Sequence, residues 1–346
     1  MSRPLHSMPG PAVPRLRVDY VRAASPMPLL GDDTLAVFGF GDVPHAHDDP
    51  RYLRVPLMPH GVAPFEVWRA NAPVLRGREP GPAHAGGAIR WATDGQLLFG
   101  AIEVDEAPYA AGAESAITAA ARHAYARMTA FVRGSDTPHL LRVWNYLDAI
   151  TLGEGDAERY REFCVGRARG LGDFDAHHLP AATAIGRCDD ARVVQVYWLA
   201  ARTPGTPVEN PRQVSAYRYP RQYGPQQPSF ARAMLPPPGS AMPLLLSGTA
   251  SVVGHATAHE GELLAQLDET FNNFDALVGA ARARQPSLPA HFGPGTRLKV
   301  YVRDHDDMAT VADALDRRLG DSVPRVLLHA AICRRELAVE IDGVHG

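Results

Sequence analysis

The chain has 346 residues, of which 45% are hydrophobic and 21% are charged, and its formal net charge at pH 7 is −3. This length is enough for two domains that each bury a core, and the composition is that of a globular protein. A charge so close to neutrality offers no basic surface for nucleic acid or for an anionic membrane, so neither is expected as a partner.

The cysteines and the first residues bear on the cellular compartment. Cys164, Cys188 and Cys333 lie far apart with no CxxC pair, which disfavours both a disulfide framework and a cysteine-rich zinc site. Residues 1–16 lack the apolar stretch of a signal peptide, and no apolar run is long enough to span a bilayer. We therefore expect a cytoplasmic protein.

In chain order, the segment up to about residue 90 contains short predicted strands at 34–41 and 64–70. A regular alternation of strands and helices then begins, in which the helices show apolar residues every three or four positions. Asp156 is expected to cap the second helix. The predicted elements are a strand at 96–104, a helix at 114–134, a strand at 139–147, a helix at 155–171 and a strand at 192–200.

The same order of elements recurs about 150 residues later. An aspartate is again expected to cap the second helix. The predicted elements are a strand at 242–254, a helix at 260–281, a strand at 296–304, a helix at 305–320 and strands at 324–332 and 336–342. A duplicated β-α-β-α-β unit is the simplest explanation, and it predicts an α/β (α+β) fold.

The stretch between the two units, 201–240, is rich in proline, arginine and tyrosine. A flexible linker would have this proline content, but linkers rarely contain so many aromatic side chains, so we expect an ordered loop that lines a site. The predicted division is an N-terminal domain with an extension at 1–200, the active-site loop at 201–240, and a C-terminal domain at 241–346.

Common catalytic and metal-binding motifs are missing from the sequence. It contains no Walker A motif, GxSxG elbow, HExxH motif or EF-hand loop. Histidines pair at 45 and 47, 177 and 178, and 255 and 259. The first two pairs lie in Pro- or Asp-rich loops, and the third precedes a helix without a cysteine or carboxylate at ligand spacing, so no metal site is expected.

The final strand places acids opposite its apolar side. Successive side chains of a strand point to opposite faces, so Glu340 leaves the face that Val339 and Ile341 bury. That second face either meets water or lines a cleft in which a carboxyl group does proton chemistry. Nearby in sequence are His329 and Cys333, while "SGTAS" at 247–251 places small hydroxyl residues at the end of a strand, where backbone can approach a ligand.

Four blocks of the sequence resemble the chorismatase family: residues 142–171, 223–233, 244–273 and 333–343. The similarity extends from about residue 85 to the end. The second half also resembles the RidA/YjgF fold, in "LKVYVRDHDDM". Because chorismatases are similar to a RidA-like trimer built within one chain, the resemblance implies an internal pseudo-trimer, for which a monomer is sufficient.

The resemblance implies cleavage of the small molecule chorismate, an enolpyruvyl ether with two carboxylates, without metal or cofactor. Glu340 corresponds to the catalytic glutamate of the family, which would have to be protonated near neutral pH to protonate the enol ether. The other implied site residues bind the substrate or line its pocket: Tyr217, Arg218, Tyr223, Arg232, Gly248, Thr249, His329 and Cys333.

Members of the family differ in product. The glycine in "SGTAS" resembles the types that form 3-hydroxybenzoate and pyruvate, some of which also form 4-hydroxybenzoate. One alternative is a hydrolase that gives a dihydroxycyclohexadiene carboxylate plus pyruvate. Another is a RidA-like protein that binds small acids or hydrolyses imines. A third is a non-catalytic scaffold that uses the loop at 201–240, here called the Tyr/Arg loop, as a contact surface.

Overall fold

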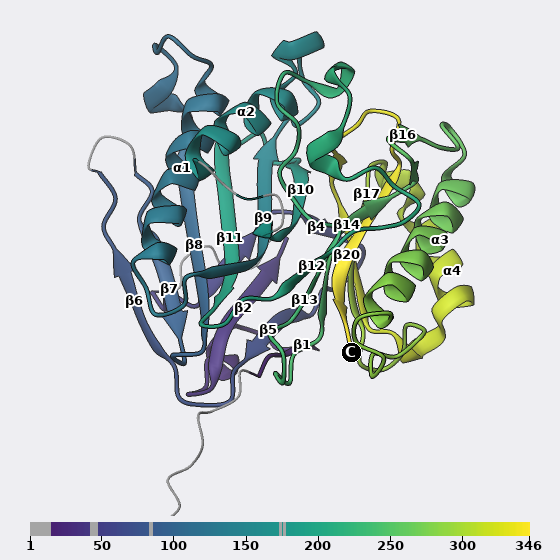
Figure 1. The fold of residues 1–346 in the computed structure, drawn as a ribbon, viewed down its shortest axis with the longest axis horizontal. Coiled ribbons are helices and arrows are strands. Elements are labelled where there is room, and N and C mark those ends of the chain that lie inside the picture. Colours follow the sequence, from purple (N-terminus) through teal and green to yellow (C-terminus); the bar gives the residue numbers. More distant parts are fainter. Residues whose placement is uncertain (1–14, 42–47, 83–85, 173–174, 176–177) are drawn as a thin grey trace, which may run out of the picture.

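A computed structural model describes residues 15–41, 48–82, 86–172, 175 and 178–346. His45, His47 and His177 lie outside these residues. The described chain forms three main sheets and one short hairpin, β15 (Val252–Val253) with β16 (Ala256–Thr257). Helices α1 (Ala116–Arg133) and α2 (Arg159–Leu171) cover one side of the molecule, and α3 (Leu263–Arg282) and α4 (Met308–Leu319) cover the opposite side (Figure 1).

The first large sheet has the strand order β19-β10-β9-β11-β8-β7-β6. β9 and β10 are parallel, and β11 lies antiparallel between β9 and β8. The apolar stripes of α1 and α2 pack on one face of this sheet. The strands are β6 (Leu75–Glu79), β7 (Ile89–Thr93), β8 (Leu97–Asp105), β9 (His139–Asp148), β10 (Ala181–Arg187), β11 (Val193–Ala201) and β19 (Ala331–Ile332).

The second large sheet repeats this topology in the order β12-β13-β14-β20-β17-β18-β4. β17 and β18 are parallel, and β20 lies antiparallel between β17 and β14, as β11 does in the first sheet. The predicted duplication is confirmed. The strands are β4 (Met58–Pro59), β12 (Thr206–Val208), β13 (Ala233–Leu235), β14 (Leu244–Ala250), β17 (Arg297–Val302), β18 (Arg325–His329) and β20 (Val339–His345).

The N-terminal sheet is a third copy of the same pattern. Its order is β1-β5-β2-β3, with β2 parallel to β3 and β5 antiparallel between β1 and β2. Within its described residues the only helical turn is the 3₁₀ helix Met27–Leu29. Three related units in one chain form the expected internal pseudo-trimer. The strands are β1 (Arg17–Val21), β2 (Thr34–Phe40), β3 (Tyr52–Val55) and β5 (Phe65–Arg69).

The inner faces of the three sheets share one hydrophobic core. Aromatic rings from different units meet there: Trp144 of β9 stacks on Tyr197 of β11 with ring centroids 4.8 Å apart, and Phe38 of β2 lies 4.7 Å from the Tyr197 ring. Trp68 of β5 lies 5.2 Å from Trp144. Offset or tilted ring pairs at such distances add to the gain from burial, so these contacts hold the units together.

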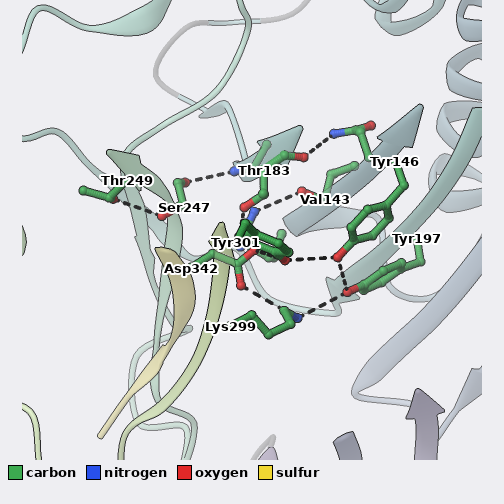
Figure 2. A network of polar contacts seen from close by, with 12 residues as sticks. Val143, Tyr146, Thr183, Tyr197, Ser247, Thr249, Lys299, Tyr301 and Asp342 are labelled. Carbon is green, nitrogen blue, oxygen red and sulfur yellow. Dashed lines mark hydrogen bonds and ion pairs between the residues drawn. The ribbon is translucent and has the colours of Figure 1, made fainter. Parts of the chain in front are cut away.

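Charged side chains lie within this core (Figure 2). The Lys299 ammonium donates hydrogen bonds to Glu66 Oε2 at 3.1 Å and to the Tyr197 hydroxyl at 3.3 Å, and lies 3.7 Å from Asp342 Oδ1. Tyr301 donates to Asp342 Oδ2 at 3.0 Å. All of these side chains are buried. A buried charge is tolerated only when it is paired, so the network fixes the relative positions of strands from all three units.

One local expectation was wrong: Asp156 does not cap α2, because the residues before the helix form a separate 3₁₀ helix, Gly155–Ala157, and Glu158 occupies the N-cap position. An aspartate does stand at the start of α4, where Asp307 occupies the N-cap position, and Asp304 caps the short 3₁₀ helix His305–Asp307 that precedes it. Residues 247–250 of "SGTAS" are the last four of β14, where the ladder to β20 shifts register between Leu246 and Thr249.

No helix among the described residues is long and apolar enough to cross a membrane.

The two large units have additional strands from elsewhere in the chain, because β4 joins the second sheet and β19 joins the first. The division into 1–200, 201–240 and 241–346 stays a prediction.

Replacing Lys299 by methionine should lower the free energy of unfolding by about 3–5 kcal/mol, because it leaves the buried Glu66 carboxylate without its cation and removes one of the two cations beside Asp342. Urea denaturation measures this loss. The control is Arg17→Met, which removes an exposed partner of Asp19 and should cost less than about 1 kcal/mol. Equal losses in the two variants would contradict the central role of the lysine.

Candidate active site

A cavity of about 560 Å³ lies where β10 of the first large sheet runs beside β14 of the second. Ser247 joins the two strands: its hydroxyl accepts a hydrogen bond from the Ala182 amide at 2.9 Å and donates to the Ala231 carbonyl at 2.6 Å. The cavity has the size of a small-molecule site. Its lining includes side chains from β10, β14, β20, the start of α2 and the loop before β13.

Glu340 lies in the wall of the cavity on β20, opposite Ala250 of β14 and Tyr301 of β17. Its side chain is buried, with 5% of the residue exposed. Burial and the negative charge of Asp342 raise the pKa of the Glu340 carboxyl to about 8, against the opposing effect of Arg142, Arg232 and Arg334. The carboxyl is therefore mostly protonated at neutral pH and can act as an acid.

Gly248 provides the space for this carboxyl. A methyl group added at Gly248 would overlap Glu340 Oε1, and would lie 3.0 Å from Glu340 Cδ and 3.3 Å from Thr183 Cγ2. Gly248 lies where the ladder between β14 and β20 shifts register. Only glycine allows the carboxyl to occupy its position without displacement.

Arg232 is fixed beside the cavity by the loop between the two large units. Its Nη2 group donates to the Tyr219 hydroxyl at 2.7 Å and to the Val214 carbonyl at 2.9 Å. The guanidinium group lies 5.2 Å from the Phe230 ring centroid. Its buried Nε–H group has no hydrogen-bond partner.

A second arginine, Arg334, lies in the turn that leads into β20. Its guanidinium group stacks 4.3 Å from the Tyr223 ring and 5.3 Å from the Tyr219 ring. Tyr223 in turn shares a hydrogen bond of 3.1 Å with His255 Nδ1. Arg334 also donates to the His255 carbonyl at 2.9 Å. These contacts hold a cation and a phenol at one wall of the cavity.

The turn that carries Arg334 is clamped from both sides. Arg303 donates to the carbonyl groups of Ile332 at 2.9 Å and of Leu337 at 2.7 Å. Gln266 of α3, which is fully buried, donates to the Glu336 carbonyl and accepts from the Ala338 amide, both at 2.8 Å. The side chains that this turn presents to the cavity are thus held before any ligand arrives.

The rim of the cavity joins two distant segments of the chain. Residues just before α2, including Glu154 and Glu158, face Gln222 and Tyr223 of the Tyr/Arg loop. Outside the rim, Arg221 donates two hydrogen bonds to the Asp156 carboxylate, at 2.8 and 2.5 Å.

Five of the predicted site residues line the cavity: Tyr223, Arg232, Gly248, Cys333 and Glu340. Burial, and secondarily the negative charge of Glu340, raise the pKa of the Cys333 thiol. The structure therefore brings together side chains that are more than 100 positions apart in the sequence.

The other four predicted residues do not line the cavity. Thr249 follows Gly248 in a strand, so it faces the opposite side, where its hydroxyl donates to the Ser247 carbonyl at 3.0 Å. His329 ends β18 beside Met58 and contacts the His305 ring. Tyr217 and Arg218 belong to a 3₁₀ helix, Ala216–Arg218, and lie against each other with 5.6 Å between guanidinium carbon and ring centroid.

Sequence analysis missed Arg334, Tyr219 and Thr183, which also line the cavity. Arg334 and Tyr219 belong to segments that were singled out, so their aromatic and basic character was the available signal. Thr183 lies on β10, a strand of small residues that was not predicted.

His255 and His259, which were considered as a metal-binding pair, make other contacts. His255 bonds Tyr223, and His259 lies 3.7 Å from Glu269. Within the described part of the chain, no group of three His, Cys, Asp or Glu side chains is arranged to hold a metal ion.

The fold and the cavity define a class of protein: an internal pseudo-trimer with a small-molecule site, in which a protonated carboxyl lies beside guanidinium groups. The family model described as "Chorismatase FkbO/Hyg5-like, N-terminal" matches residues 66–200. The chain is also 35% identical to a chorismatase of Streptomyces hygroscopicus over 81% of this chain and 78% of the relative, so it belongs to the chorismatase family.

Named relatives cover most of the chain. It is 37% identical to a chorismatase of Streptomyces rapamycinicus over 81% of this chain and 81% of the relative. It is 32% identical to a 3-hydroxybenzoate synthase of Streptomyces hygroscopicus over 92% of this chain and 93% of the relative. A crystal structure of a chorismatase aligns with 97% of this chain and 100% of its own, with a TM-score of 0.83 and 32% identity.

Gly248→Ala should displace the Glu340 carboxyl, because the added methyl group overlaps it, and should reduce the turnover of the natural substrate at least tenfold. Crystallography of the variant would show the displaced side chain. Gly279→Ala is the matched control: it adds a methyl group in open space on α3 and should leave turnover unchanged while slightly stabilising the helix. A variant with full activity and an unmoved Glu340 would contradict this packing argument.

Proposed function

We propose that this protein cleaves chorismate to pyruvate and 3-hydroxybenzoate, with Glu340 as the acid that starts the reaction. The observation that carries the proposal is the Glu340 carboxyl itself, which is buried in a cavity wall with a pKa of about 8 and is flanked by arginines. The names of the relatives, chorismatase and 3-hydroxybenzoate synthase, support the choice of substrate and product.

Proton transfer to carbon is the first chemical step. The terminal methylene carbon of the enolpyruvyl ether accepts the proton of Glu340, and positive charge develops at the adjacent ether carbon as an oxocarbenium-like centre. Glu340 becomes a carboxylate at this moment and can stabilise that positive charge. An ionised carboxylate could not supply the proton, so the surroundings of Glu340 must keep the carboxyl group protonated until the reaction begins.

The two carboxylates of chorismate need cationic or phenolic partners. Arg232 lies in the cavity wall, and Arg334 presents a guanidinium group beside Tyr223. Both arginines are fixed by hydrogen bonds to backbone or to tyrosine, so little conformational freedom is lost when substrate binds. The same fixed cations orient the ether so that its methylene carbon faces Glu340.

The product depends on what attacks the activated centre. Pyruvate and 3-hydroxybenzoate together contain the atoms of chorismate, so a route through the substrate's own ring hydroxyl needs no water. Its attack on the oxocarbenium carbon forms a cyclic ketal and returns a proton to Glu340. Loss of a ring proton with cleavage of the ring C–O bond of that hydroxyl aromatises the ring, and the resulting hemiketal collapses to pyruvate and 3-hydroxybenzoate. The hydrolytic alternative consumes one water and leaves the dihydroxycyclohexadiene carboxylate. We favour the aromatising route, because Gly248 resembles the types that form 3-hydroxybenzoate and because Phe230, Ala250 and Leu337 give the cavity apolar wall surface.

We place this reaction in the cytoplasm, without a cofactor, and in a monomer. The three cysteines of the chain are free thiols, which suits a reducing compartment. The cavity is lined by the two large units and the loop between them, and the shared core joins all three units within one chain, which supports a site that needs no second copy.

The proposal is tested by incubating the purified protein with chorismate and separating the products by chromatography. Pyruvate and 3-hydroxybenzoate are expected in equal amounts. 4-Hydroxybenzoate appears as a second product if the ring keeps the oxygen of its own hydroxyl group and loses the ether oxygen. If the dihydroxycyclohexadiene carboxylate is the only ring product, the protein is the hydrolase and the 3-hydroxybenzoate assignment is wrong. Absence of any chorismate turnover would refute the proposed function.

Glu340→Gln keeps the shape of the side chain and removes its acidic proton, so kcat should fall on the order of a hundredfold or more. In the unsubstituted protein, kcat/KM should fall above about pH 8, since the reaction needs the protonated acid and the carboxyl loses its proton as the pH rises through its pKa. The residual activity of the variant should lack this decline. Steady-state kinetics between pH 5 and 10 would reveal either behaviour, and an unchanged kcat in the variant would exclude Glu340 as the acid.

A further inference from the structure

Asp342 lies two residues after Glu340 on β20. Alternate residues of a strand share a face and lie about 7 Å apart, so the two carboxyl groups are close neighbours. Asp342 is fully buried, and it is not part of the cavity lining. A second acid on the same buried face, without contact to the ligand space, has no role in the proposed chemistry described above.

The Asp342 carboxylate is held in place by three polar partners. Tyr301 donates to its Oδ2 atom at 3.0 Å (Figure 2). The Arg142 guanidinium group lies 3.3 Å from the same atom, and Lys299 lies 3.7 Å from Oδ1. Two cations and a phenol donor thus compensate the buried negative charge.

Arg142 connects this carboxylate to the cavity wall. The guanidinium group donates to the Thr183 hydroxyl at 2.5 Å and to the Val143 carbonyl at 3.0 Å, and it lies 4.3 Å from the Trp144 ring. It is fully buried and does not line the cavity, whereas Thr183 does. Arg142 is therefore fixed behind the wall and cannot turn toward a ligand.

The network is electrically balanced without Glu340. It contains the carboxylates of Glu66 and Asp342 and the cations of Lys299 and Arg142. An ionised Glu340 would place a further negative charge next to Asp342, whose side chain is fully buried. Charges of the same sign at this separation and burial repel strongly.

We propose that Asp342 is a positioning residue for catalysis, whose fixed negative charge keeps Glu340 in its acid form before each turnover, with Arg142 as the counter-charge that limits this effect. The inference rests on the proposed function and names the group that prepares its acid. The other charged or titratable groups near Glu340 are Arg232, Arg334 and Cys333 at the cavity, Arg303 behind the turn and Tyr160 on α2.

Substrate binding makes the role of Asp342 larger. The carboxylates of the substrate pair with the cavity arginines, Arg232 and Arg334, which in the empty site favour ionisation of Glu340. Once these cations are neutralised, Asp342 is the dominant charge beside the acid. The acid therefore retains its proton until the enol ether is in place to receive it.

The test is the pH dependence of chorismate turnover in charge-removing variants. The alkaline limb is the fall of kcat/KM at high pH, where Glu340 loses its proton. Asp342→Asn should move this limb to lower pH by on the order of one unit, and Arg142→Met should move it to higher pH. Damage to the fold would change activity in the same direction for both variants. Glu66→Gln is the control, because it removes a carboxylate of the same network on the far side of Lys299 and should leave the limb in place.

A second readout does not depend on turnover. The infrared carbonyl band of the protonated Glu340 carboxyl should be present at pH 7 in the unsubstituted protein, absent in Glu340→Gln and about half as strong in Asp342→Asn. If Asp342→Asn does not fold, the double variant Asp342→Asn/Arg142→Met removes the buried pair together and should show a smaller shift to lower pH.

Unshifted limbs and an unchanged carbonyl band in folded Asp342 variants would overturn the inference, as would shifts of the same sign in Asp342→Asn and Arg142→Met. Failure of the proposed function looks different: the unsubstituted protein would then not turn over chorismate at all, while the carbonyl band would still report on Asp342.

Discussion

The ion pair between Lys299 and Glu66 is the interaction on which the rest of the structure depends. It joins β17 of one unit to β5 of another, and through Tyr197 it reaches the third. Lys299 is the only lysine of the chain, and its ammonium group is buried where the three sheets meet. Because an unpaired charge in such a place is costly, each unit can pack only in the arrangement that satisfies the others.

The candidate active site is an extension of this centre. β20 carries Asp342 in the buried network and Glu340 in the cavity wall, so one strand places the acid and its negative neighbour at a fixed separation. β9 contributes Arg142 to the same network, and β10 beside it contributes Thr183 to the cavity. In our proposal, the protonation of Glu340 is therefore coupled to the packing of the three units, so a change in the core would alter the reaction.

Sequence periodicity was enough to predict the two large units, because each has long helices with clear apolar stripes and strands with regular alternation. The third unit could not be recognised in this way. Its described residues contain only one short helical turn, so it lacks the 3.6-residue period that marks the other two. β10 was missed because alanine, threonine and glycine give a strand little hydrophobic contrast.

The acid and its glycine neighbour were identifiable from sequence, since both belong to short blocks with clear family resemblance and the strand pattern already set Glu340 apart. The side-chain directions in the Tyr/Arg loop were not identifiable, because two 3₁₀ helices decide which aromatic residue faces the cavity. Tyr219 lines it, whereas Tyr217 does not. The electrostatic role of Asp342 also requires the structure, since its partners come from strands far apart in sequence.

Covalent fusion of the three units has a kinetic consequence. In a trimer of separate subunits, every interface forms by collision, and dilution shifts the balance toward free subunits. Here the interfaces between the sheets form within one polypeptide, so their effective local concentration is set by the connecting segments and does not change when the protein is diluted. Fusion also lets the three units differ in sequence, so the boundary between β10 and β14 can form a cavity while the inner faces of the sheets form a packed core.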